Sequence, residues 1–205
     1  PSLRPNIICK HFIKYPYLEG MTIFYHDSDI IFRHMPDWID FLHDDLWYAS
    51  NVRSYVGCDC IINAVGREIF EDMCRIVDVD SESVILNDKN TGGAQFILKQ
   101  VPVSFWEKVE QDCENLYAYL LERTKSDNFF NDLKDSSNFQ VWCVDMWIHW
   151  WNAIKMGKVF KIVEEMNFCW ADSKLEEWNK CNILHYTGKM NEYNLNGKYF
   201  RKRNY

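Results

Sequence analysis

The chain has 205 residues, with 30 Asp and Glu against 23 Lys and Arg, and a net charge of −7 at pH 7. This acidic balance argues against a protein that binds nucleic acid or an anionic membrane surface, and the length predicts one domain spanning residues 1–205 with a substantial core. Aromatic residues make up 16% of the sequence, with nine Trp, which fits either a Trp-rich core or rings that stack on sugars.

The eight cysteines indicate reduced thiols rather than a disulfide framework. Only Cys58 and Cys60 lie close together, as CxC, and no spacing typical of a zinc site occurs. A chain of this size does not need disulfides to be stable, so we expect a cytoplasmic protein with mostly buried thiols. The sequence contains no apolar run of about 18 residues and no signal peptide, so we expect no integral membrane segment.

The first half of the chain predicts short helices and strands. Pro16 stops the first helix, and Gly57 to Cys60 signal a bend. We expect helices over residues 2–13, 38–42 and 67–77, and strands over residues 21–26 and 46–50.

The second half predicts two long helices and ends in short apolar runs. A polar loop over residues 87–93 precedes an expected helix over 94–99, and residues 124–138 are polar and predict a mobile surface loop. We expect long helices over residues 102–123 and 142–154, then short core strands at 167–170 and 182–185. The predicted class is therefore α/β.

Two carboxylates follow the strand predicted over residues 21–26, in the stretch YHDSDIIF. Residues i and i+2 of a strand point to the same side, so Asp27 and Asp29 share one region of solvent. Like charges this close are costly unless they are neutralised, and a divalent cation is the commonest partner for such an oxygen pair. A plain surface turn remains the alternative.

Two other stretches carry residues suited to binding. Gly92 and Gly93 before an expected helix would present backbone N–H groups to an anion or a sugar hydroxyl, although a simple turn is equally open. His185 ends a short apolar run and could be a satisfied core histidine; as a nitrogen ligand beside Asp27 and Asp29 it would favour Mn²⁺ over Mg²⁺.

Asp145 is a lone carboxylate on a helix that is aromatic nearly all round, in the stretch WCVDMWIHWW. Such a helix is expected to be buried, so the carboxylate needs a partner or a chemical role. A purely structural role, with Asp145 bonded to an amide or an arginine, stays open.

The stretches FYHDSDIIF, NTGGAQFILK, WCVDMW and ILHYTGK, in this order, resemble the GT-A glycosyltransferases. The likeness is greatest to the retaining galactosyltransferase and glycogenin-like group and to related bacterial glycosyltransferases, and it spans about residues 1–190. It implies a Rossmann-like mixed sheet flanked by helices. Such folds place βα units of the nucleotide-binding region before the DxD strand, whereas few residues precede it here, so we expect part of those units to be missing.

The resemblance also implies a metal-dependent transfer of a sugar from a nucleotide donor, expected to be a UDP-sugar, to a saccharide or glycoconjugate acceptor with retention of configuration. Asp27, Asp29 and His185 would hold Mn²⁺ or Mg²⁺. At the donor diphosphate, the resemblance implies contacts from Ser28, Gly188 and Lys189. At the substrates, it implies contacts from Gly92, Gly93, Gln95, Asp145 and Trp147. Gln95 and Asp145 would be the catalytic residues.

Two alternatives come from other classes. A haloacid-dehalogenase-like phosphatase also uses DxD after an apolar strand with Mg²⁺, but the bulky Ile30 and Ile31 follow the pair here. A non-enzymatic carbohydrate-binding domain would explain the tryptophans, but such modules are typically all-β.

Overall fold

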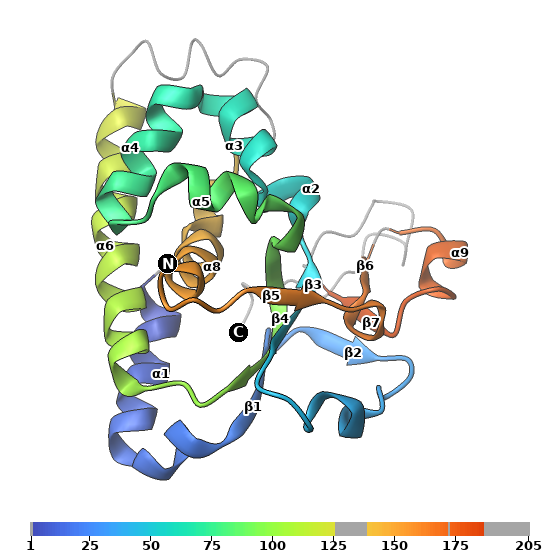
Figure 1. Ribbon diagram of the computed structural model, residues 1–205. Helices are drawn as coiled ribbons and strands as arrows, with labels where there is room; N and C mark the ends of the chain where they lie inside the picture. The colour runs from blue at the N-terminus through green and yellow to red at the C-terminus, as the bar shows by residue number, and fades with distance from the viewer. Residues whose placement is uncertain (1, 126–138, 172, 187–205) are drawn as a thin grey trace, which may run out of the picture.

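The computed structural model describes residues 2–125, 139–171 and 173–186 (Figure 1). From residue 126 on, the predicted mobile loop over 124–138 lies outside the described residues. The expected diphosphate contacts Gly188 and Lys189 also lie outside them.

The larger sheet has four strands in the order β1-β4-β3-β5. The strands are β1 (Thr22–His26), β3 (Trp47–Asn51), β4 (Gly92–Lys99) and β5 (Phe160–Ile162). β4 pairs antiparallel with both β1 and β3, and β3 pairs parallel with β5. The predicted strands near residues 21–26 and 46–50 are thus confirmed.

The helix expected over residues 94–99 is wrong, because this segment belongs to β4. Every residue of β4 is buried, so the segment lacks the polar–apolar alternation of a half-exposed strand. A short continuous apolar run does not distinguish a buried strand from a helix, and the pairing with a strand on each side decides the outcome here.

The smaller sheet has three strands in the order β2-β7-β6. They are β2 (Ile30–Phe32), β6 (Phe168–Trp170) and β7 (Ile183–His185). β7 runs antiparallel to β2 and parallel to β6, and the predicted strands near residues 167–170 and 182–185 are confirmed. This sheet extends to one side of the main body (Figure 1).

Helices cover the larger sheet. The α-helices are α1 (Leu3–Lys14), α2 (Arg53–Val56), α3 (Cys58–Val65), α4 (Arg67–Val77), α5 (Ser81–Leu86), α6 (Val103–Lys125), α8 (Val144–Lys155) and α9 (Leu175–Trp178). Short 3₁₀ segments are η1 (Pro16–Gly20), η2 (Trp38–Phe41), η3 (Asp88–Asn90), η5 (Val141–Cys143) and η6 (Glu164–Met166).

The bend predicted at Gly57 to Cys60 is the start of helix α3. Gly57 is the residue before the helix, and the buried carboxylate of Asp88 accepts a hydrogen bond of 2.6 Å from the backbone N–H of Cys58. Asp88 also accepts from Arg53 at 2.5 Å. A side chain distant in sequence thus satisfies one of the backbone donors that a helix start leaves open.

The core lies between the helices and the larger sheet. α8 packs between α6 and β4, and α1 packs on α6 (Figure 1). The largest fully buried side chains are Trp47, Trp106, Trp147, Trp150 and Trp151, so most of the tryptophan content serves the core. The α/β class with mixed sheets is confirmed.

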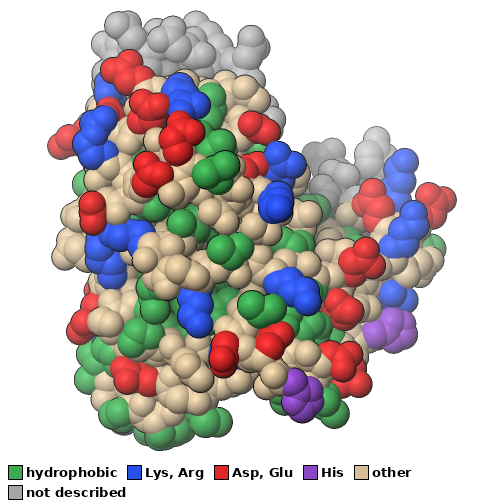
Figure 2. Space-filling model, viewed as in Figure 1, with side chains coloured by type: hydrophobic (Ala, Val, Ile, Leu, Met, Phe, Trp, Pro, Cys, Tyr) green, Lys and Arg blue, Asp and Glu red, His purple; other side chains and the backbone are tan. Residues whose placement is uncertain are grey.

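Acidic and basic side chains are interspersed on the face shown in Figure 2, with no extended area of one sign. The eight cysteines are free thiols, most of them buried. No helix within the described ranges has the length and apolar character needed to cross a bilayer.

Candidate metal centre

The pairing of β2 with β7 brings the two aspartates to the histidine. Asp27, Ser28 and Asp29 form the link between β1 and β2, and Ser28 is exposed there. His185 lies opposite Ile30 in the antiparallel register. The backbone N–H of Tyr186 donates to the carbonyl of Asp29 at 2.7 Å, which fixes the end of β7 to this link.

The side chains of Asp27, Asp29 and His185 converge. His185 Nε2 lies 3.3 Å from Asp27 Oδ2 and 3.5 Å from Asp29 Oδ1, and one ligand atom from each residue lies within 4.8 Å of the others. Adjacent ligands of an octahedral ion with bonds of about 2.1 Å lie about 3 Å apart. The three residues therefore fit a divalent cation after small side-chain movements.

The orientation of His185 suits a ligand. Its Nε2 faces the aspartates, while its Nδ1 is buried without a hydrogen-bond partner among the described residues. Trp170, the parallel partner of His185, stacks on the imidazole with ring centroids 5.1 Å apart and an interplanar angle of 26°. The stacking holds the imidazole with Nε2 toward the aspartates, whereas the hydrogen bond that a metal-bound histidine usually donates from its other nitrogen is absent among the described residues.

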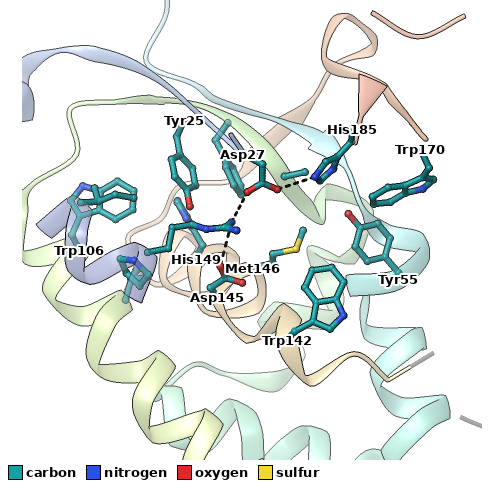
Figure 3. A pocket seen from close by; sticks show the side chains of 16 residues that line it. Tyr25, Asp27, Tyr55, Trp106, Trp142, Asp145, Met146, His149, Trp170 and His185 are labelled. Atoms are coloured by element: carbon teal, nitrogen blue, oxygen red, sulfur yellow. Dashed lines mark ion pairs between the residues drawn. The ribbon is translucent and has the colours of Figure 1, made fainter. Parts of the chain in front are cut away.

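Arg4 of α1 joins the aspartate pair to Asp145. Its guanidinium lies 2.8 Å from Asp27 Oδ1 and 3.4 Å from Asp145 Oδ2 (Figure 3, dashed). Burial alone would lower the pKa of Arg4, but Tyr25, Asp145 and Asp27 together raise it above its ordinary value. Arg4 is therefore a permanent positive charge between two carboxylates.

Asp145 lies in the first turn of α8, where the helix dipole favours a negative charge. Burial raises the pKa of its carboxyl, the positive charge of Arg4 opposes that effect, and Asp27 adds to it. The carboxylate thus has the partner that a buried acid needs, and it also lines the same pocket as Asp27 and His185.

The pocket lies between α1, α8 and the smaller sheet. Its interior of about 70 Å³ admits only a few water molecules, so a larger ligand would lie across its opening, where Trp142 is exposed. Asp27 and Asp145 supply its acidic groups, Arg4 its basic group, and His149 and His185 its imidazoles. Three aromatic side chains, Tyr55, Trp142 and Trp170, lie on the side of the pocket away from Trp106 (Figure 3). The cavity is thus charged at one end and apolar on its walls.

His149, one turn after Asp145, lines the inner end of the pocket. It is 4% exposed and stacks on Phe96 with centroids 4.5 Å apart and an interplanar angle of 9°. Its Nε2 has no hydrogen-bond partner among the described residues. Burial lowers the pKa of His149 to about 3, so the imidazole is neutral at physiological pH.

Four residues expected at the substrates do not line this pocket. Gly92 and Gly93 lie within β4 rather than at a helix start, so the helix-terminus anion site expected there is wrong. Gln95 is fully buried, and its Oε1 accepts a hydrogen bond of 2.5 Å from Ser50.

Trp147 is also buried, and its indole N–H donates to the carbonyl of Val56 at 3.1 Å. Its side chain therefore packs in the core. Only Asp145 of the expected substrate contacts reaches the pocket.

Sequence reasoning missed Arg4, Tyr55, Trp142 and Trp170. Each lies on a different element, α1, α2, η5 and β6, and none belongs to a spaced motif. The one available signal was Trp142, because it stands at the start of the aromatic stretch that contains Asp145.

Comparisons with known proteins found no match: no protein-family model, no curated protein and no solved structure matches the chain.

Proposed function

We propose that this chain is a metal-dependent glycosyltransferase of the GT-A type, which transfers a sugar from a nucleotide donor such as a UDP-sugar to a saccharide acceptor with retention. The observation that carries the proposal is the convergence of Asp27, Asp29 and His185 at the mouth of a pocket that also holds Arg4 and Asp145. The likeness of the DxD and ILHYTGK stretches to GT-A enzymes gives the reaction class.

The charges of the pocket suit a diphosphate leaving group. A cation held by Asp27, Asp29 and His185 would stabilise the negative charge that develops on the leaving diphosphate. Arg4 would supply a second positive charge close to the same group. Asp145, on the far side of Arg4, would accept hydrogen bonds from sugar hydroxyls and stabilise positive charge at the anomeric carbon.

The two alternatives receive less support. A dehalogenase-like phosphatase would use Asp27 as its nucleophile, whereas the two carboxylate oxygens of Asp27 face Arg4 at 2.8 Å and His185 at 3.3 Å. A carbohydrate-binding module of the usual all-β type would not contain the long helices α6 and α8.

A thermal-shift experiment tests the proposal. UDP should stabilise the protein with Mn²⁺ present and not in EDTA, because the diphosphate completes the coordination of the ion. At 100 times its Kd a ligand adds about 2.7 kcal/mol, a rise in Tm of about 5–10 °C for a chain of this size.

A matched pair of variants locates the effect. Asp29→Asn should abolish the metal-dependent shift, whereas the exposed Asp40→Asn should keep it. Equal stabilisation by UDP in EDTA, or an unchanged shift in Asp29→Asn, would refute the assignment of the site.

A further inference from the structure

An aromatic wall lies beside the metal centre in the pocket. We define it as Tyr55 of α2, Trp142 of η5 and Trp170 of β6 (Figure 3). Tyr55 and Trp170 meet edge to face with centroids 5.8 Å apart, and Trp170 in turn stacks on His185. The wall is therefore in ring-to-ring contact with a proposed metal ligand.

Trp142 differs from the other tryptophans of the chain. It is 61% exposed although it lines the pocket, whereas the five largest core tryptophans are almost fully buried. An indole left open to solvent at a pocket mouth gains contact area only when a ligand covers it. Its position in the segment before α8 places it next to the helix that carries Asp145.

Tyr55 adds a polar group to the wall. Its hydroxyl makes no hydrogen bond to any described residue, and Figure 3 shows it directed toward the side of the pocket that holds His185. Burial raises the pKa of Tyr55, and the nearby Cys143 and Asp27 raise it further, so the phenol stays protonated and can donate. The pocket thus offers an aromatic surface with a donor at its edge and the carboxylate of Asp145 beyond.

We propose that the aromatic wall binds the acceptor as a neutral pyranose ring, with the apolar face of the sugar on Trp142 and a sugar hydroxyl on Tyr55. This inference rests on the proposed function, since the wall then holds the acceptor hydroxyl beside the metal-bound donor. Three carboxylates and a donor diphosphate outweigh the charge of Arg4 and one dication, so an acidic sugar would be repelled.

A nucleobase would also stack on an indole, but the wall suits it less well. A base needs both donors and acceptors along its edge. Arg4 is already paired with Asp27 and Asp145, and His185 Nε2 faces the aspartates, so the free donor at the wall, among the described residues, is the phenol of Tyr55. Carboxylates accept hydrogen bonds from the many hydroxyls of a sugar. The observations therefore favour the pyranose, and base binding becomes an outcome of the test.

Saturation-transfer NMR on the protein with Mg²⁺ and UDP provides the test, because Mn²⁺ would broaden the signals. The probes are the methyl pyranosides of glucose, galactose, mannose and N-acetylglucosamine, with methyl glucuronide as the acidic match for the glucoside and uridine as a separate arm. At least one neutral glycoside should receive saturation at its ring C–H protons, and the glucuronide should not.

Variants then place the sugar on the wall. Trp142→Ala should weaken the glycoside by about tenfold or more, and Tyr55→Phe should weaken it without loss of fold. Leu175→Ala, at an exposed site in α9, should bind as the wild type does. The thermal midpoint of each variant confirms that it is folded.

Three results would overturn the inference. The first is that no neutral glycoside binds, and the second is that Trp142→Ala binds the glycoside as tightly as the wild type does. The third is that Trp142→Ala loses the binding of uridine while it keeps the binding of the glycoside. Stabilisation by UDP and metal is measured on the same samples. If UDP and metal stabilise the protein but no glycoside binds, only the inference about the aromatic wall is refuted. If a glycoside binds but UDP and metal have no effect, the proposed transferase function is refuted and the sugar site at the aromatic wall stands.

Discussion

His149 makes the stability of this protein depend on pH in a way that one substitution should remove. Its imidazole is enclosed by Phe96, Phe105 and Trp106, with no hydrogen-bond partner for Nε2 among the described residues. Burial lowers the pKa of His149 to about 3, against about 6.5 in an unfolded chain. The folded protein therefore excludes a proton that the unfolded chain takes up.

This difference in pKa means that the protein loses stability as the pH falls. Above pH 6.5 both states carry a neutral imidazole, and as the pH falls toward 3 only the unfolded state gains the proton, so stability is lost. From the two pKa values, His149 should lower the free energy of unfolding by about 2 kcal/mol between pH 7.5 and pH 5. His149→Phe keeps an aromatic ring in the cage and removes the titrating group.

Urea denaturation at pH 7.5 and pH 5 measures the effect, in EDTA and with dilute protein, because pH 5 is close to the pI of about 5.4. Over this pH range the free energy of unfolding of the wild type should fall by about 2 kcal/mol more than that of His149→Phe. The exposed His43→Gln should behave as the wild type. Equal losses in wild type and His149→Phe, or an imidazole NMR signal of His149 that titrates near pH 6.5, would refute the reasoning.

Three further predictions follow from the packing and the pocket. Gly92→Ala should destabilise the protein by about 1–3 kcal/mol in urea denaturation, because the new Cβ would lie 2.4 Å from the Cβ of Ala49; an unchanged midpoint contradicts this. Asp88→Ala should lower the free energy of unfolding by about 1–3 kcal/mol, since it leaves the Cys58 N–H without its acceptor, and a neutral result would show that water replaces the carboxylate. Asp145→Asn should reduce turnover at least about tenfold with metal and UDP binding intact. NMR of the first product of the wild type should show the anomeric configuration of the donor. An inverted product would mean that Asp145 acts as a base.

Much of the fold was predictable wherever the periodicity was strong. The helix over 67–77 matches α4, and the long predicted helices match α6 and α8 to within a few residues. β4 was not predictable, because a strand buried on both faces loses the alternation that marks strands. The single domain over residues 1–205 and the GT-A fold stay predictions.

The candidate site was predictable where chemistry is concentrated in a motif. The spacing of Asp27 and Asp29 predicts a metal site, and His185 lies next to them in the structure as expected. Arg4 and Tyr55 could not be found in the same way, because a single arginine or tyrosine on a short helix has no spacing to interpret. Only the packing of α1 and α2 around the pocket gives these residues a role.

The small sheet has a consequence for how the protein is made. β2 ends at Phe32, and its partner β7 begins only at Ile183, so nearly all the described chain must leave the ribosome before the two can pair. Contacts so distant in sequence form late, because closing a long loop costs entropy first. A nascent chain thus carries both aspartates long before it carries the histidine, and the ability to hold a metal would mark the end of folding.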